Sequence, residues 1–199
     1  MKLLLVIVLV CAGLLLLPNL RNKIYGRIFR GQTGGQSSCS DGWYITGYYV
    51  PREDELPGPT EEIEVERLGN MSFSQEFLEA IRTEGWGITR FGWALGFYGG
   101  AWHRSDRGAL DASGKTLVIG AIAIDRSVVP AGAQVQISTL PTPWGAKGFQ
   151  ATDIGNGIVG QHIDVFTGIG KEAEQETFRI TSENNRVCVT NSATHAAGE

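Results

Sequence analysis

The feature that most constrains the fold is a series of short apolar segments after residue 120, separated by glycine and proline turns. Such runs, rich in β-branched and aromatic residues, are typical of strands. The candidate strands span residues 121–124, 134–138, 149–152, 162–166 and 186–190. Residues 44–50 are also aromatic and β-branched and end at Pro51, so they predict a sixth strand. Short strands at this close spacing indicate a six-stranded β-barrel.

One helix is predicted near residues 72–82. Ser72 and Gln75 have the spacing of a capping box, and Gly85 is a suitable end. Four apolar side chains share one helical face: Phe73, Phe77, Leu78 and Ile81. The fold class is therefore mainly β, with a barrel at residues 43–190 and one peripheral helix packed outside it. We expect the acidic, proline-rich residues 52–66 to form a surface loop or edge.

The N-terminal sequence is typical of a targeting segment. Lys2 is followed by an unbroken apolar run at residues 3–17 and then Pro18, so residues 1–18 are expected to be a signal peptide or a membrane anchor. The run is shorter than the roughly 20 residues that span a bilayer, and no small-x-small cleavage site follows it. The basic residues after the run would place the body of the protein in the cytoplasm by the positive-inside rule. These signals oppose one another and leave the topology open.

Residues 19–42 are expected to be a flexible linker, because their second half is small and polar, and residues 191–199 a disordered tail. Cys39 and Cys188 are the two cysteines outside the apolar run. In an exported protein they can pair, which we predict as a hypothesis, whereas two free thiols are the equal alternative. The sequence pI near 5.4 and the absence of a long Lys/Arg block argue against a nucleic-acid partner.

Three aspartates stand out. Asp125 and Asp153 each end an apolar strand, and Asp164 lies inside one, between two apolar residues. Carboxylates are rare in apolar strands without a partner or a task. The glycines between Asp153 and Asp164 allow a sharp reversal that would bring the two carboxyls together and raise one pKa. The alternative is that they accept backbone hydrogen bonds in turns. For Asp125 an ion pair is as good an interpretation as a place in the site.

These aspartates stand in three stretches that resemble the 3D (three-aspartate) domain family: AIAID at 121–125, ATDIGNGIVGQHID at 151–164, and the trailing VFTGIGKEAE. The family's order of motifs is also kept by two longer stretches, LDASGKTLVIGAIAIDRSVVPAG and the closing NNRVCV. A further stretch, TGYYVP at 46–51, is similar to a strand of the same enzymes. The resemblance is in particular to the C-terminal part of the membrane-bound lytic transglycosylase A family. Such a long ordered set of motifs is specific, unlike a lone glycine motif.

The resemblance implies a double-psi β-barrel and a peptidoglycan lytic transglycosylase. Asp164 matches the catalytic acid/base, Asp153 its neighbouring carboxylate, and Asp125 the first aspartate. Tyr48 and Tyr49 of the TGYYVP strand are expected to bind substrate. The substrate would be the glycan strands of peptidoglycan, cleaved after N-acetylmuramic acid with formation of a 1,6-anhydro sugar, and no cofactor or metal is implied. The protein would then be exported to the cell envelope, on the periplasmic or outer face of the membrane, with the apolar segment contacting that membrane.

The chain departs from the family between the TGYYVP strand and Leu110, where only about sixty residues stand in place of a large second domain. A full second domain is therefore not expected. This interval is aromatic, and flat rings can stack on sugars, so we expect one or two of them, Trp102 among them, to line a groove. For any single ring a core position is the commoner role. His162 shares a strand face with Asp164 and is expected to bind substrate beside it. It could also orient the Asp164 carboxyl, or be an ordinary barrel histidine.

Two other functions stay open. The first is a non-catalytic module that binds the cell wall or acts as a scaffold, because a fold does not fix a function. The second is a site for a hard cation built from Asp125, Asp153, Asp164 and His162. The second ranks last, because the sequence has no loop with metal-ligand spacing.

Overall fold

The computed structural model describes residues 37–190. The expected targeting segment, the expected tail and most of the expected linker lie outside these residues. Within the described part of the chain, no helix is long and apolar enough to cross a membrane.

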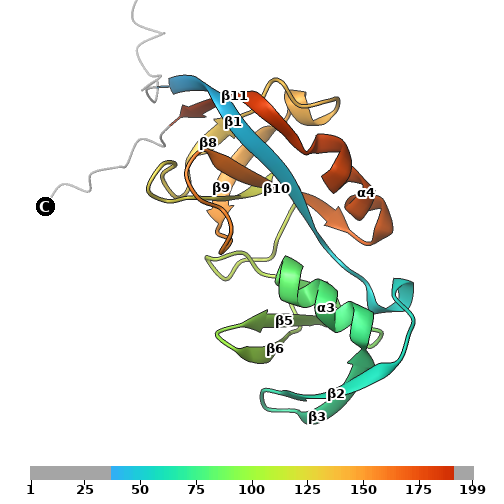
Figure 1. Cartoon of the computed structure of the whole chain (residues 1–199). Coiled ribbons are helices and arrows are strands. Elements are labelled where there is room, and N and C mark those ends of the chain that lie inside the picture. The colour runs from blue at the N-terminus through green and yellow to red at the C-terminus, as the bar shows by residue number, and fades with distance from the viewer. Residues whose placement is uncertain (1–36, 191–199) are drawn as a thin grey trace, which may run out of the picture. The chain divides into compact units, whose positions relative to one another are not determined.

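Six strands close into a barrel, as Figure 1 shows. In their order around the barrel they are β1 (Ser37–Val50), β10 (His162–Ile169), β7 (Ala121–Ile124), β9 (Gly148–Asp153), β8 (Gln134–Gln136) and β11 (Ser182–Thr190). The pairs β1/β10 and β7/β9 are parallel, and the other pairs that close the barrel are antiparallel. Each of the six predicted strands falls on one of these, so the prediction of a six-stranded barrel is confirmed.

The barrel core consists of apolar side chains from alternate strand positions. In β10, Ile163 and Val165 are fully buried in this core. Because successive side chains of a strand point to opposite faces, Asp164 between them points out of the barrel. The same alternation that builds the core therefore brings a carboxyl to the outer face.

Strand β1 begins at Ser37, so the expectation that the linker runs to residue 42 is wrong for residues 37–42. These small polar residues pair with β11, and Cys39 lies directly opposite Cys188. The two cysteines form a disulfide, with their Cα atoms 4.0 Å apart. The predicted pairing is confirmed, and composition alone misled because exposed strands can be polar.

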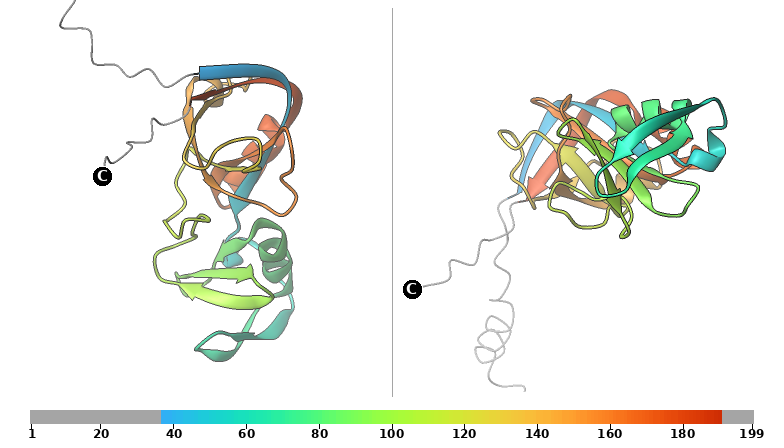
Figure 2. Two further views of the ribbon diagram at one scale, coloured as in Figure 1. Left: turned by 90° about the vertical axis from the view of Figure 1, so that its left-hand side faces the viewer. Right: turned by 90° about the horizontal axis from the view of Figure 1, so that it is seen from below.

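A second sheet, called the small sheet below, has the order β3-β2-β6-β5-β4 and is seen apart from the barrel in the left view of Figure 2. Its strands are β2 (Thr60–Val65), β3 (Gly69–Ser74), β4 (Trp86–Ile88), β5 (Ala94–Tyr98) and β6 (Ala101–Ser105). The interval after the TGYYVP strand is thus a folded unit. The expectation of a loop at residues 52–66 is wrong, since they contain the 3-10 helix η1 (Glu53–Glu55) and β2. Only Ile63 and Val65 of β2 are buried, among glutamates, which is too short an alternation to reveal a strand.

The predicted helix is α3 (Gln75–Glu84), with Ser74 rather than Ser72 at its N-cap. Its apolar face packs on the small sheet through Phe77, Leu78 and Ile81, and its C-terminal end lies against β1 of the barrel. A second helix, α4 (Lys171–Ile180), was not expected. Its buried face carries Ala173, Thr177 and Ile180, so the apolar periodicity that would have predicted it is weak.

A shared apolar cluster joins the barrel to the small sheet. It contains Tyr48 and Phe166 from the barrel and Trp86 and Ala94 from the small sheet. Helix α4 lies against β1 on the barrel, where a Cβ atom on Gly47 would stand 2.7 Å from the Cα of Thr177. A side chain at this position would force the strand and the helix apart.

Candidate active site

Asp164 and Asp153 lie on either side of one residue, Ala123 of β7. Asp164 of β10 is its register partner on one side and Asp153 of β9 on the other. Two strand spacings, about 9.5 Å, therefore separate their backbones, and both residues face the same side of the sheet. The strand register, rather than the glycine-rich loop after β9, brings the two carboxyls together.

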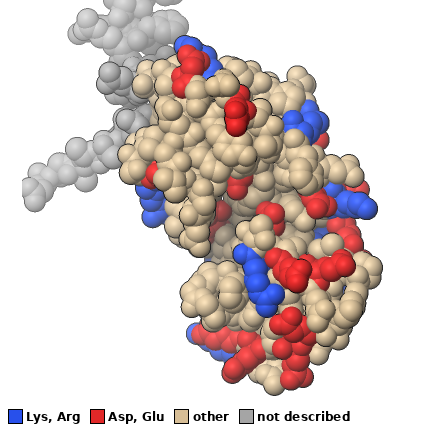
Figure 3. All heavy atoms as spheres, viewed as in Figure 1, with Lys and Arg blue, Asp and Glu red and all other residues tan. Residues whose placement is uncertain are grey.

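Both carboxyls line one cleft of about 230 Å³, called the aspartate cleft below. Its other walls come from β1 and from the end of α3, through Thr46, Tyr48 and Glu84. In the space-filling view of Figure 3, acidic atoms lie in the hollow between the barrel and the small sheet. The predicted meeting of Asp153 and Asp164 is thus what the structure has, and the cleft is open to a ligand.

Asp164 is half-buried, and one side chain donates to it. The Thr46 hydroxyl donates a hydrogen bond of 2.7 Å to its Oδ1. Burial raises the pKa of Asp164 to about 6; the nearby Asp153 adds to the rise, and the Thr46 hydrogen bond opposes it. Such a carboxyl is available in both protonation states near neutral pH, which general acid/base catalysis requires.

His162 reaches Asp164 through Thr46. Its Nε2 lies 2.9 Å from the Thr46 hydroxyl oxygen. That hydroxyl has one proton, so when it donates to Asp164 it accepts from Nε2, which requires the tautomer with the ring proton on Nε2. Burial lowers the pKa of His162, which favours its neutral form. His162 thus fixes the orientation of the Thr46 hydroxyl, and through it that of Asp164.

Asp153 has three donors. Tyr48 donates its phenolic proton to Oδ2 at 2.9 Å, and the backbone N–H groups of Ala112 and Ile154 donate to Oδ1 at 2.9 Å each. Burial raises the pKa of Asp153, and these three hydrogen bonds oppose that rise. Tyr48, predicted as a substrate residue, lines the cleft and also holds Asp153 in place.

A larger cavity of about 410 Å³ adjoins the aspartate cleft and is called the helix cavity below. It lies between β1, α3 and α4 and shares Thr46, Gly47, Thr83 and Glu84 with the cleft. Its remaining walls carry rings, hydroxyls and a carboxyl: Tyr44, Tyr49, Glu174, Thr177, Phe178 and Thr181, with Ala80. Tyr49, also predicted as a substrate residue, therefore belongs to this cavity. Burial, with Glu174 nearby, raises its pKa to about 12.

Asp125 and Trp102 lie elsewhere. Asp125 accepts hydrogen bonds from the backbone and hydroxyl of Ser127 and from the Gly160 N–H, which lower its pKa, and it lines neither cavity. Its partners are thus the donors of a turn, and neither of the two interpretations offered for Asp125, an ion pair or a place in the site, describes them. Trp102 is 8% exposed in the core of the small sheet, with its ring 4.6 Å from that of Phe97. Its inward position on β6 explains why it lines no groove, and the other aromatic residues of the interval line neither cavity.

Glu84, the last residue of α3, lines both cavities but was not predicted from the sequence. Burial raises its pKa to about 7, the charges of Asp164 and Glu174 add to the rise, and the Tyr49 N–H opposes it. Nothing in the sequence separates this glutamate from the exposed ones of the same helix, since only the packing of α3 against β1 brings it to the site. Thr46 could have been predicted as a site residue, because it is the first residue of the TGYYVP motif.

Within residues 37–190, no group of three or more His, Cys, Asp or Glu side chains is placed to hold a metal ion. The alternative cation site requires Asp125 together with Asp153, Asp164 and His162. Since Asp125 is turned toward Ser127 and Gly160, the structure does not assemble that set.

Residues 120–185 match the family model described as the 3D domain. This segment is a 3D domain. It runs from the start of β7 into β11 and contains all three aspartates that the motifs predicted. The resemblance found in the sequence is therefore confirmed for the 3D domain, which here supplies most of the barrel. No curated protein sequence matches the chain.

Solved structures with a similar fold extend the comparison beyond the 3D domain. Escherichia coli MltA with bound chitohexaose aligns with a TM-score of 0.59 at 17% identity, over 77% of this chain and 72% of that chain. A second structure of E. coli MltA aligns with a TM-score of 0.53 at 18% sequence identity, over 76% of this chain and 73% of that chain. A membrane-bound lytic murein transglycosylase from Agrobacterium tumefaciens aligns with a TM-score of 0.53 at 15% sequence identity. The alignment covers 74% of this chain and 73% of that chain.

These similarities establish the fold. The chain has the lytic transglycosylase-like fold of MltA, and the double-psi barrel prediction is confirmed. An alignment over 77% of the chain includes more residues than the barrel contains, so the likeness extends into the small sheet. The small sheet thus lies in the interval between the TGYYVP strand and Leu110, for which a full second domain was not expected from the sequence.

Proposed function

We propose that this protein is a peptidoglycan lytic transglycosylase, which cleaves the glycosidic bond after N-acetylmuramic acid and forms a 1,6-anhydro sugar. The observation that carries the proposal is the pair Asp164 and Asp153, placed on either side of Ala123 and lining one cleft. The MltA-like fold and the 3D domain support it. Within this proposal Asp164 is the acid/base and Asp153 its supporting carboxylate.

The reaction uses one carboxyl twice. Protonated Asp164 gives its proton to the glycosidic oxygen while the bond from that oxygen to C1 of the muramic acid breaks. The Asp164 carboxylate then takes the proton of the 6-hydroxyl of the same sugar, as that oxygen bonds to C1. The proton lost in the first transfer is regained in the second, so the enzyme returns to its starting state without consuming water. A pKa of about 6 suits both transfers.

Asp153 acts on the reaction through Asp164. Its charge helps to raise the proton affinity of Asp164, so that a useful fraction of Asp164 carries the proton near neutral pH. Three hydrogen-bond donors hold Asp153 in position for this role. Thr46 and His162 are positioning residues, which fix the direction in which the Asp164 carboxyl presents its proton.

The aspartate cleft and the helix cavity together form the proposed glycan site. Tyrosine rings can pack on the apolar faces of sugars, while threonine hydroxyls and carboxyls bond the sugar hydroxyls. Tyr44, Tyr49 and Phe178 supply the rings in the helix cavity. The structure of E. coli MltA with chitohexaose, on a similar fold, supports the choice of a glycan as ligand.

With this substrate, we infer that the protein acts in the cell envelope, on the periplasmic or outer face of the membrane, and that the apolar run at residues 3–17 is its targeting or membrane segment. The disulfide between Cys39 and Cys188 supports this location, because disulfides persist in oxidising compartments.

The product identifies the reaction. Purified peptidoglycan is digested with the full chain, and the released muropeptides are analysed by mass spectrometry. We expect muramic acid ends that lack one water relative to the product of hydrolysis. Ordinary hydrolysis products would contradict the transglycosylase assignment. Sedimentation of the protein with peptidoglycan without any release of fragments would instead favour the non-catalytic wall-binding module.

A further inference from the structure

Glu84 is a half-buried carboxyl at the point where the aspartate cleft and the helix cavity meet. It ends α3, and it is the one carboxyl among the four residues that the two cavities share. A chain that extends from one cavity into the other passes along the four shared residues, of which Glu84 is one.

The surroundings of Glu84 disfavour its charge. Within residues 37–190 its side chain forms one hydrogen bond, accepted from the Tyr49 N–H at 3.2 Å, and no cation pairs with it. Two other carboxyls, Asp164 and Glu174, are close enough to raise its pKa further. A helix C-terminus also carries partial negative charge, which repels a carboxylate at this position. Glu84 therefore costs the folded state free energy that its contacts with the protein do not offset.

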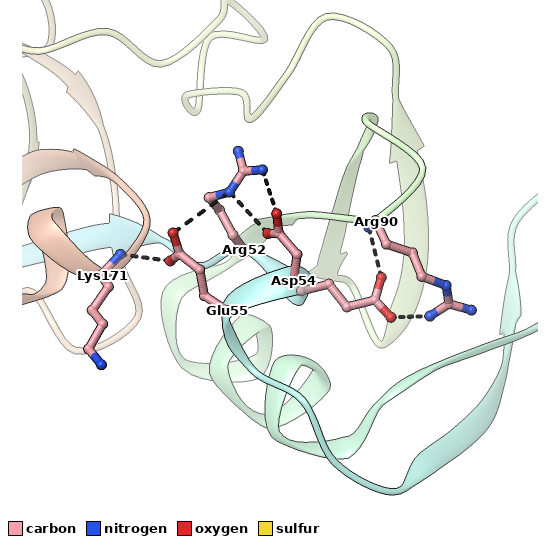
Figure 4. Close-up of polar contacts among 6 residues, drawn as sticks. Arg52, Asp54, Glu55, Arg90 and Lys171 are labelled. Carbon is pink, nitrogen blue, oxygen red and sulfur yellow. Dashed lines mark hydrogen bonds and ion pairs between the residues drawn. The ribbon is translucent and has the colours of Figure 1, made fainter.

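Two neighbouring carboxylates show how this fold treats a structural glutamate. Glu53 is 5% exposed, accepts hydrogen bonds from the backbone N–H groups of Ser74 and Arg90, and pairs with the Arg90 guanidinium. Glu55 accepts the Lys171 N–H at 2.8 Å, at the N-terminus of α4, with Arg52 beside it, as Figure 4 shows. Each has a cation or a helix N-terminus as partner. Glu84 has neither, which sets it apart from the carboxyls that hold the fold together.

We propose that Glu84 is a further substrate-contacting residue of this site, which hydrogen-bonds a hydroxyl or acetamido group of the glycan where it passes from the aspartate cleft into the helix cavity. The inference rests on the proposed function. A neutral Glu84 can both donate and accept, so it can hold a sugar group beside Asp164 without placing a second negative charge next to the acid/base. This role explains why an unpaired carboxyl is kept at the junction.

The contact predicts a pH dependence. The titratable groups that face Glu84 are Asp164 on β10, Glu174 on α4 and Tyr49 on β1, with Asp153 further along the same cleft. As the pH rises through about 7, Glu84 loses its proton and with it the ability to donate. Glycan affinity should therefore fall on the alkaline side of neutrality.

Binding of chitohexaose tests the contact without requiring turnover. The affinity of the full chain for this probe is measured by calorimetry between pH 5.5 and 8.5, in an Asp164→Asn background so that Asp164 does not titrate. Glu84→Gln keeps a donor and an acceptor but cannot ionise, so it should bind as tightly as the Asp164→Asn parent at pH 6. At pH 8.5, where that parent has lost the Glu84 proton, Glu84→Gln should bind about tenfold more tightly, the effect expected for one hydrogen bond, so its pH dependence should be flat. Glu79→Gln is the matched control, because Glu79 is exposed on the same helix and lines neither cavity.

Equal affinities and equal pH profiles for the Glu84→Gln and Glu79→Gln proteins would overturn the proposal. A second measurement needs no variant at position 84: the NMR signal of the Glu84 carboxyl carbon should shift when chitohexaose is added, and an unchanged signal under saturating sugar overturns the contact. Failure of the parent chain to bind chitohexaose would also overturn it. Binding with the expected Glu84 effect, but without anhydro products from peptidoglycan, would contradict the proposed function alone.

Discussion

Asp164 and Asp153 are chemically identical side chains whose surroundings differ in the number of donors. Three donors support Asp153, and the Thr46 hydroxyl is the side-chain donor to Asp164. Donors to a carboxylate favour its ionised form, so the less supported Asp164 is the better proton carrier. This difference supports Asp164 rather than Asp153 as the proposed acid/base.

Thr46→Val tests the positioning role of Thr46, because valine has nearly the same shape but no hydroxyl. The hydrogen bond from Thr46 opposes the rise in the pKa of Asp164, so its removal should raise that pKa further. The alkaline limb of the pH–rate profile should then move to higher pH, while the loss of orientation lowers kcat by about tenfold. Kinetics of glycan release across pH 5 to 9 measure both effects. A profile with an unchanged alkaline limb would exclude this role for Thr46.

At the residue scale, the pairing of Asp153 with Asp164 was predictable, since both stand in apolar strands and in a family motif. The reason for their pairing was not predictable, because the sequence does not show that β9 and β10 both pair with β7 at Ala123. Asp125 also stands in a family motif, but its carboxyl accepts hydrogen bonds from Ser127 and Gly160 in a turn and does not face the cleft. Glu84 carries no signal, and only the tertiary packing of α3 brings it to the site.

At the scale of elements, β1 connects the parts of the site. It pairs with β10 through Thr46 and Asp164, contributes Tyr48 to the aspartate cleft, and passes under α4 at Gly47. The six barrel strands were predictable because glycine and proline delimit apolar runs of suitable length. The strands of the small sheet and α4 were not, since their runs are short or their buried faces contain small and polar residues.

Gly47→Ala should destabilise the protein, because its Cβ would stand 2.7 Å from the Cα of Thr177, which is backbone and cannot rotate away. Overpacking of this kind costs about 1 to 3 kcal/mol. Gly148→Ala is the control: Gly148 is also a strand glycine, but a Cβ there meets no atom within 4 Å. Urea unfolding of both variants measures the free energy of unfolding. Equal stability of the two would show that β1 and α4 do not need the close approach.

At the scale of the whole molecule, two sheets with separate cores share one apolar cluster, and the proposed site lies where they meet. Helix α3, which packs on the small sheet, contributes Thr83 and Glu84 to both cavities. The barrel therefore supplies the proposed acid/base, and the helix that the small sheet carries adds to the walls. The sequence predicted the barrel and its aspartates but not this division, because the small sheet has no motif of its own.

The disulfide should stabilise the whole fold, since it links positions 149 residues apart and so restricts the unfolded chain. Replacement of both Cys39 and Cys188 by alanine should lower the free energy of unfolding by about 2 to 4 kcal/mol. The measurement is urea unfolding of the parent and double variant, each with and without reductant. The reductant should affect only the parent. Equal stability of parent and variant under oxidising conditions would show that the link contributes nothing to the fold.

If Asp164 performs both proton transfers, the rate at which the Asp164→Asn protein releases anhydro-muropeptides from peptidoglycan must depend on this residue. Asparagine keeps the shape of the side chain but cannot exchange the proton, so the rate should fall by about 10² to 10⁴ while the fold and chitohexaose binding remain. Asp125→Asn, a matched change outside both cavities, should retain cleavage per folded molecule. Release of anhydro-muropeptides by folded Asp164→Asn at the parent rate would contradict the account.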